Sequence, residues 1–158
     1  MENMENLGEL KAFHIAEMLE DGTEKLLIDG DLINHLRESH FDMKLIMIED
    51  ENGYHLVGTK SRKGSSYHCI IALTYMLEFG KRTISILGGG RIRLDVDEFV
   101  IYDKSGSYDA MDKEKTEGIM KKLDANFKMP HPSLHTWKKA AEYSYESVIK
   151  EIHNILSD

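Results

Sequence analysis

The clearest hydrophobic pattern lies in two adjacent segments of the first half of the chain. Residues Phe41 to Glu49 contain the continuous apolar run Leu45–Ile48, which is typical of a strand buried on both faces. The polar residues 50–53 follow, and Tyr54–Val57 then resumes an apolar pattern. Two such segments joined by a short polar turn predict a β-hairpin.

The pattern changes period after this hairpin. A loop at 58–64 leads to a predicted helix that Ser65 or Ser66 caps and that ends near Gly80. The apolar run Thr83–Leu87 predicts the next strand. Two further segments, 91–94 and 98–102, pair as a second hairpin around the polar residues 95–97.

Helices are predicted elsewhere along the chain, with apolar residues at spacings of three and four. They cover 7–20, Asp31 to about Glu38, and a segment capped by Asp112 that runs to about Leu123; a short strand follows at 126–129. Ser133 caps a long last helix to about Leu156, whose apolar stripe consists of Leu134, Trp137, Ala141, Tyr145, Val148, Ile152 and Ile155.

This order of elements predicts an α+β fold with a mixed, largely antiparallel sheet flanked by helices. A length of 158 residues fits one domain. No apolar run reaches the roughly 18 residues that span a bilayer, so we expect no membrane segment. The N-terminus is polar and acidic, unlike a secretory signal, and Cys69 is the only cysteine. Together these features favour the cytoplasm.

Charge is distributed unevenly along the chain. The net charge of −8 argues against a nucleic-acid partner. Residues 59–93 nevertheless carry seven basic side chains and one acidic one, a formal charge of +6. Such a local field can attract a small anion or a phosphorylated partner. The alternative is chance clustering on solvated surfaces.

Leu87–Ile92 reads Leu-Gly-Gly-Gly-Arg-Ile, directly after a predicted strand. Consecutive glycines cost backbone entropy, so they occur where φ is positive or where another group approaches the backbone closely. Gly88, Gly89 and Gly90 therefore predict a turn that presents Arg91. The turn is either an anion site, most naturally for phosphate, or a hairpin corner with a surface arginine.

Other candidate residues surround this motif in the sequence. His68 stands at the start of a predicted helix, whose dipole favours the neutral imidazole that can accept a proton or attack phosphorus; the alternative is a capping or packing histidine. The backbone N–H groups of Ser105, Gly106 and Ser107 can form an anion-binding nest, or the segment is an ordinary loop. Lys44 is either a phosphate contact or a lysine at the edge of its strand.

Metal and nucleotide motifs are not apparent. His131 and His135 have a helical spacing, but Pro132 lies between them and no carboxylate is near in the sequence. The chain has no P-loop, dinucleotide fingerprint or nucleophile elbow. We therefore expect neither a metal nor a cofactor.

Taken together, Tyr67-His68, Leu87–Ile92 and the segment Ser105-Gly-Ser-Tyr108 resemble the phosphohistidine phosphatase family, also called the Janus/Ocnus family. An apolar strand that begins with lysine, Lys44–Ile48, precedes them in the same order. The resemblance covers about residues 41–129, which we take as the family-like core; 1–40 and 130–158 are predicted helical extensions.

The resemblance implies a phosphatase that uses no metal or cofactor, with His68 as general base or as nucleophile. It implies that Lys44, Lys60 and Arg91 neutralise phosphate charge and that the backbone of Ser105–Ser107 holds phosphoryl oxygens. The implied substrate is a phosphorylated protein or a small phosphoramidate. In this hypothesis Gly88–Gly90 make the turn beside the pocket and position Arg91.

Two other functions remain open at this point. The same fold can bind phosphate or a phosphoprotein without turnover, because fold does not determine catalysis. Alternatively, the long C-terminal helix is a scaffold for a partner. The two terminal extensions either pack over one face of the sheet or form the contact of a homodimer.

Overall fold

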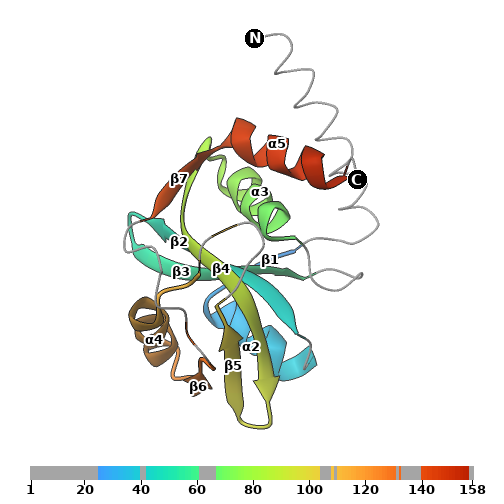
Figure 1. Cartoon of the computed structure of the whole chain (residues 1–158). Helices are drawn as coiled ribbons and strands as arrows, with labels where there is room; N and C mark the ends of the chain where they lie inside the picture. Colours follow the sequence, from blue (N-terminus) through green and yellow to red (C-terminus); the bar gives the residue numbers. More distant parts are fainter. Residues whose placement is uncertain are drawn as a thin grey trace.

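The computed structural model describes residues 25–39, 42–60, 67–103, 108, 110–130, 132 and 140–156. Within these ranges the chain forms one seven-stranded sheet with helices on both faces (Figure 1). In chain order the elements are β1 Lys25–Ile28, α2 Gly30–Ser39, β2 Met43–Asp50, β3 Gly53–Lys60, α3 His68–Phe79, β4 Thr83–Asp95, β5 Glu98–Tyr102, α4 Lys113–Lys122, β6 Phe127–Lys128, β7 Ala141–Ser144 and α5 Tyr145–Leu156. None of the described helices is long and apolar enough to cross a membrane.

The strands lie in the order β1-β3-β2-β4-β5-β6, and β7 also pairs with β4. Neighbouring strands are antiparallel except β5 and β6, so the prediction of an α+β fold with a mixed, largely antiparallel sheet is confirmed. Both predicted hairpins are present, β2–β3 and β4–β5. The predicted helix after Asp112 and the short strand near 126–129 also form, as α4 and β6.

The strand β2 is buried on both faces. In β2, Ile46 and Ile48 face the core shared with α3 and α5, whereas Leu45 and Met47 face the core shared with α2 and α4. This alternation explains why the β2 sequence is continuously apolar: each face of the strand packs against a different helical layer. Figure 1 shows α3 and α5 side by side across one end of β4.

Strand β4 contains a β-bulge at Leu87. Met47 of β2 pairs with Gly88, but Ile48 pairs with Ile86, so Leu87 is an extra residue on β4. One extra residue inverts the alternation of side chains beyond it. Ile84 and Ile86 therefore face α3 and α5, while Ile92 faces α2 and α4. By the same inversion, Arg91 lies on the face of α3.

The prediction that Gly88–Gly90 form a turn is wrong, because β4 runs through them without interruption. All three pair with β2, and none has a positive φ. At Gly90 the need for glycine is steric. A Cβ there would collide with the carbonyl oxygen of Tyr102 and lie 3.2 Å from the sulfur of Met111.

The other edge of β4 is divided between two strands. Its residues Thr83–Ile86 pair with β7, and Arg91–Asp95 pair with β5. Residues 87–90 lie between these two ladders. On this edge, and within the described part of the chain, they make one isolated bridge, from Gly89 to Ala110. The division leaves a gap in the ladder at the glycines.

The prediction of one helix from Ser133 to Leu156 is wrong. Residues 141–144 form β7, and α5 begins only at Tyr145. Pairing with the free edge of β4 satisfies the backbone of 141–144, which outweighs its helical periodicity. Val148, Ile149 and Ile152 of α5 are buried against α3, so these apolar positions stabilise this chain and are not exposed to a partner.

The boundaries of two other elements also differ from the prediction. The N-cap of α3 is Tyr67, in an extended conformation and without a side-chain cap, so neither Ser65 nor Ser66 has that role. The segment 25–28, which precedes the family-like core, forms strand β1 beside β3. The predicted helix at 7–20 lies outside the described residues.

A histidine clamp ties three segments together at one end of the sheet. His55 of β3 contacts Asp29 through Nδ1 at 2.6 Å and Asp50 through Nε2 at 3.0 Å. Ionised carboxylates only accept hydrogen bonds, so the protonated imidazole, which donates from both ring nitrogens, is the form that satisfies both contacts. Partial burial lowers the pKa of His55, but hydrogen bonds and charges from Asp29 and Asp50 outweigh it, and the net pKa is raised.

We expect Gly90→Ala to destabilise the fold by about 2 kcal/mol or more, because the new methyl group meets backbone atoms that cannot rotate away. The matched control is Gly118→Ala in α4, where a Cβ meets nothing within 4 Å. There alanine should stabilise the protein by about 0.5–1 kcal/mol. Urea unfolding measures both, and a Gly90→Ala protein as stable as wild type would contradict the close approach.

His55→Gln should cost more stability at pH 6 than at pH 9. Since the folded-state pKa is raised, the protonated clamp stabilises the fold fully below about pH 6.5, the usual value of the unfolded state, and loses its effect as pH rises through the folded pKa. The measurement is the free energy of unfolding of both proteins across this range. His35→Gln should show the opposite trend, because burial and Lys60 lower the pKa of His35; equal costs of His55→Gln at both pH values would refute the clamp.

Candidate functional site

The candidate site is centred on His68, the first residue of α3. Its side chain is buried, with 6% of the residue exposed, and lies beside the gap in the β4 ladder. The ring atom Nε2 is 2.9 Å from the carbonyl oxygen of Gly90. A carbonyl oxygen can only accept, so Nε2 carries the hydrogen. This contact fixes the tautomer and leaves the lone pair of the neutral ring on Nδ1.

The electrostatic surroundings keep His68 neutral. Burial lowers the pKa of His68, the hydrogen bond to Gly90 opposes this, and the charges of Lys44 and Arg91 lower it further. The net pKa lies below the usual value, so the imidazole is uncharged at neutral pH. A neutral imidazole with a fixed tautomer can accept a proton from water or attack an electrophile through Nδ1.

Lys44 and Arg91 are brought together by strand pairing. They are direct partners in the β2–β4 register, and both lie on the α3 face of the sheet. The Lys44 ammonium lies 4.8 Å from the ring centroid of Tyr67, the residue before His68. Arg91 Nε is 3.3 Å from Asp42, in an ion pair whose two side chains are each 46% exposed. Two cations thus lie next to the buried histidine, as an anion site requires.

The structure does not place Lys60 with these residues. A Cβ added at Gly58 of the same strand would meet the side chain of Leu32 in α2. Side chains alternate along β3, so Lys60 lies on that same face of the sheet. The charge of Lys60 acts on His35 of α2. Lys60 therefore lies on the side of the sheet opposite His68.

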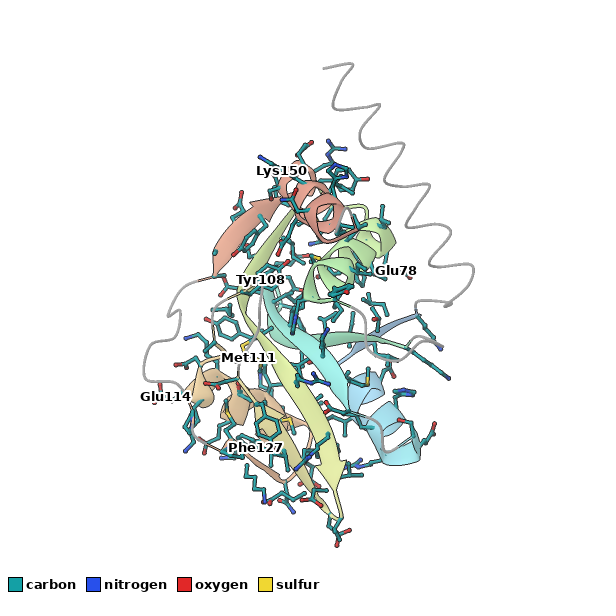
Figure 2. The ribbon with its side chains drawn as sticks, turned by 45° about the vertical axis from the view of Figure 1, so that its right-hand side comes forward. Glu78, Tyr108, Met111, Glu114, Phe127 and Lys150 are labelled. Atoms are coloured by element: carbon teal, nitrogen blue, oxygen red, sulfur yellow. The ribbon has the colours of Figure 1, made fainter. Side chains whose placement is uncertain are left out.

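Ser105, Gly106 and Ser107 lie outside the described residues, so their predicted role stays a prediction. The next residue, Tyr108, is described and packs its ring edge against His68, with the centroids 6.4 Å apart. Tyr108 belongs to the core under α3 and α5, whereas Met111 belongs to the opposite core. Figure 2 shows both side chains beside the central strand β4.

Two features of the site were missed from the sequence. One is the carbonyl of Gly90 as the partner of His68: the glycines were interpreted as a turn, although an unbroken strand is what aims this carbonyl. The other is Tyr143 of β7, whose ring packs against Tyr108 with centroids 5.2 Å apart. The helical spacing of the C-terminal segment concealed its strand, and no other signal in the sequence pointed to this tyrosine.

A separate polar cleft of about 470 Å³ lies at the other end of α3, lined by Glu49, Asp50, Glu51, Tyr75, Lys81, Arg82, Thr83, Ile84 and Ser85. Tyr75 is seven residues along the helix from His68, or about 10 Å. The cleft contains none of the predicted site residues. Among the described residues, no group of three or more histidine, cysteine or acidic side chains is arranged to hold a metal ion.

Comparisons with protein-family models, with curated proteins and with solved structures found no match to this chain. The interpretation of the site therefore depends on its geometry and on the motifs in the sequence.

We expect nitrogen-detected NMR of the histidine rings to show His68 with hydrogen on Nε2 and a titration midpoint below 6.5. Lys44→Gln should raise that midpoint, because it removes a positive charge that disfavours the imidazolium. Lys60→Gln is the matched control: it should leave His68 unchanged and raise the midpoint of His35 instead. Hydrogen on Nδ1, or equal effects of the two lysine variants on His68, would disprove this geometry.

Proposed function

We propose that this protein is a phosphatase that hydrolyses phosphohistidine or a related N-phosphoryl group, with His68 as the catalytic residue. The observation that carries the proposal is the state of His68. Its ring is neutral, its tautomer is fixed by Gly90, and Lys44 and Arg91 lie on the same face of the sheet. This combination suits attack on a phosphoryl group, which needs a base or nucleophile beside positive charge.

His68 can act by either of two routes. As a general base, Nδ1 takes a proton from water while the water oxygen bonds to phosphorus and the P–N bond of the substrate breaks. The departing nitrogen keeps the electron pair of that bond and takes up a proton, either from the His68 imidazolium or from solvent. As a nucleophile, Nδ1 itself bonds to phosphorus, the substrate imidazole leaves with the electrons of its P–N bond, and water then cleaves the new bond. The second route exchanges one P–N bond for another, so the transfer step changes the bond type little.

Each basic residue has a different role in this proposal. Arg91 uses Nε for Asp42, and among the described residues its two Nη groups have no hydrogen-bond partner, so they are available to phosphoryl oxygens. Lys44 supplies a second charge beside the ring of Tyr67. From their sequence pattern, we further propose that the backbone N–H groups of Ser105, Gly106 and Ser107 hold phosphoryl oxygens. Lys60, on the other face, is not included.

The proposed setting is the cytoplasm, with a phosphorylated protein or a small phosphoramidate as substrate. The single cysteine, Cys69, is buried in α3, and burial raises the pKa of its thiol to about 12. Such a thiol is unreactive. This fits a protein that depends on no disulfide, as is usual in a reducing compartment.

His68→Ala should reduce hydrolysis of phosphohistidine or phospholysine by at least about a hundredfold, the usual contribution of a general base. The assay measures phosphate release in the presence of a chelator. The matched control is His35→Ala on the opposite face of the sheet, which should retain wild-type activity.

Three outcomes would contradict the proposal or its metal-free route. If wild-type protein binds phosphate at Arg91 but releases none from either substrate, the chain is a phosphate-binding module of the same fold. If His68→Ala remains fully active, the catalytic residue lies elsewhere. A loss of activity on chelation alone would contradict the metal-free route.

A further inference from the structure

The sheet face beside the candidate site stays exposed beyond the start of α3. Lys44, Arg91 and Tyr102 are direct partners across β2, β4 and β5. Arg93 lies two residues farther along β4, on the same face and about 7 Å from Arg91. Arg91 and Arg93 are exposed, and Tyr102 is 38% exposed. Together Arg91, Arg93 and Tyr102 form what we call the basic platform.

The platform has an apolar floor. Val100 lies directly opposite Arg93 in the β4–β5 register, and Lys128 of β6 is its partner on the other side. Val100 itself is only 1% exposed. Arg93 places its guanidinium 5.6 Å from the ring centroid of Tyr102. A planar cation stacked on an exposed ring is a surface that can hold an extended chain and pair with a carboxylate.

Arg93 differs from two other cations of this face, because among the described residues it takes part in no ion pair. Lys128 is paired with Glu98 at 3.7 Å, and Arg91 with Asp42 at 3.3 Å. Among the described residues, no carboxylate lies within ion-pair distance of Arg93. An arginine kept on the surface without a carboxylate of its own chain is electrostatically suited to an acidic group from elsewhere.

We propose that the basic platform binds a polypeptide substrate that carries acidic residues two or three positions from its phosphorylated side chain. This rests on the proposed function, since it takes Arg91 as the phosphate contact. An extended chain advances about 3.3 Å per residue, so the second residue from the phosphate reaches the level of Arg93. The net charge of −8 opposes a nucleic acid on the same surface, whereas a short peptide responds to the local field.

The test measures binding separately from turnover. Full-length protein is titrated into fluorescein-labelled eight-residue peptides with a central phosphohistidine, flanked either by aspartate and glutamate or by serine, and anisotropy is recorded. We expect wild type to bind the acidic peptide about threefold or more tightly, within the range of one exposed charge pair. Arg93→Gln should abolish this preference, and Tyr102→Thr should reduce it.

Lys128→Gln is the matched control, since it removes a cation from the same face whose charge Glu98 already neutralises. It should keep the preference. Equal effects of Arg93→Gln and Lys128→Gln would overturn the proposal, as would a wild type without preference. So would an eight-nucleotide single strand that binds more tightly than the acidic peptide and depends on Arg93.

The failure of this inference can be told from that of the proposed function. A small phosphoramidate has no flanking residues for the platform to bind, so Arg93→Gln should hydrolyse it at the wild-type rate. A wild type that hydrolyses the small substrate but ignores acidic flanks refutes the platform alone. A wild type that hydrolyses neither substrate refutes the phosphatase, while the anisotropy measurements still decide whether the platform selects acidic peptides.

Discussion

The arrangement of this molecule depends on one extra residue in its central strand. Leu87 has no partner of its own on β2, and the bulge it makes reverses which face each following side chain occupies. Without the bulge, Ile84 and Ile86 could not face α3 and α5 while Ile92 faces α2 and α4. Arg91 would then lie on the side away from His68. Burial of both faces enforces the register, because a slip by one residue would expose apolar side chains and bury arginines.

The site lies at the glycines that follow the bulge, where the edge of β4 is divided between two partner strands. Strands β5 and β7 cover the two ends of that edge, and the chain near Ala110 crosses the gap between them. In this gap the carbonyl of Gly90 accepts the hydrogen of His68. A motif that was predicted to be a turn is thus a strand segment, and it positions the histidine through its backbone. The same strand places Arg91 beside the histidine and Arg93 two residues farther along, where both arginines belong to the basic platform.

Local patterns predicted much of this correctly, for identifiable reasons. The apolar run of β2, the two hairpins and the Asp112 cap each depend on neighbours in the sequence, and each is found. His68 at the start of a helix was also predicted from local signals. The errors occurred where a distant partner decides the conformation. Residues 141–144 have helical spacing but complete the ladder of β4, and Lys60 is close to the other basic residues in sequence yet lies on the opposite face.

By itself, the sequence determined the class of fold, the burial of β2 on both faces, and a basic stretch that contains a histidine, a glycine run and Arg91. These follow from periodicity and residue chemistry, which are local properties. The tertiary structure alone decided which of those residues meet. It placed Lys44 and Arg91 beside His68, excluded Lys60, and converted the glycine turn into a strand. The reason is that the face of a strand residue depends on register, and register is set by pairing across the whole sheet.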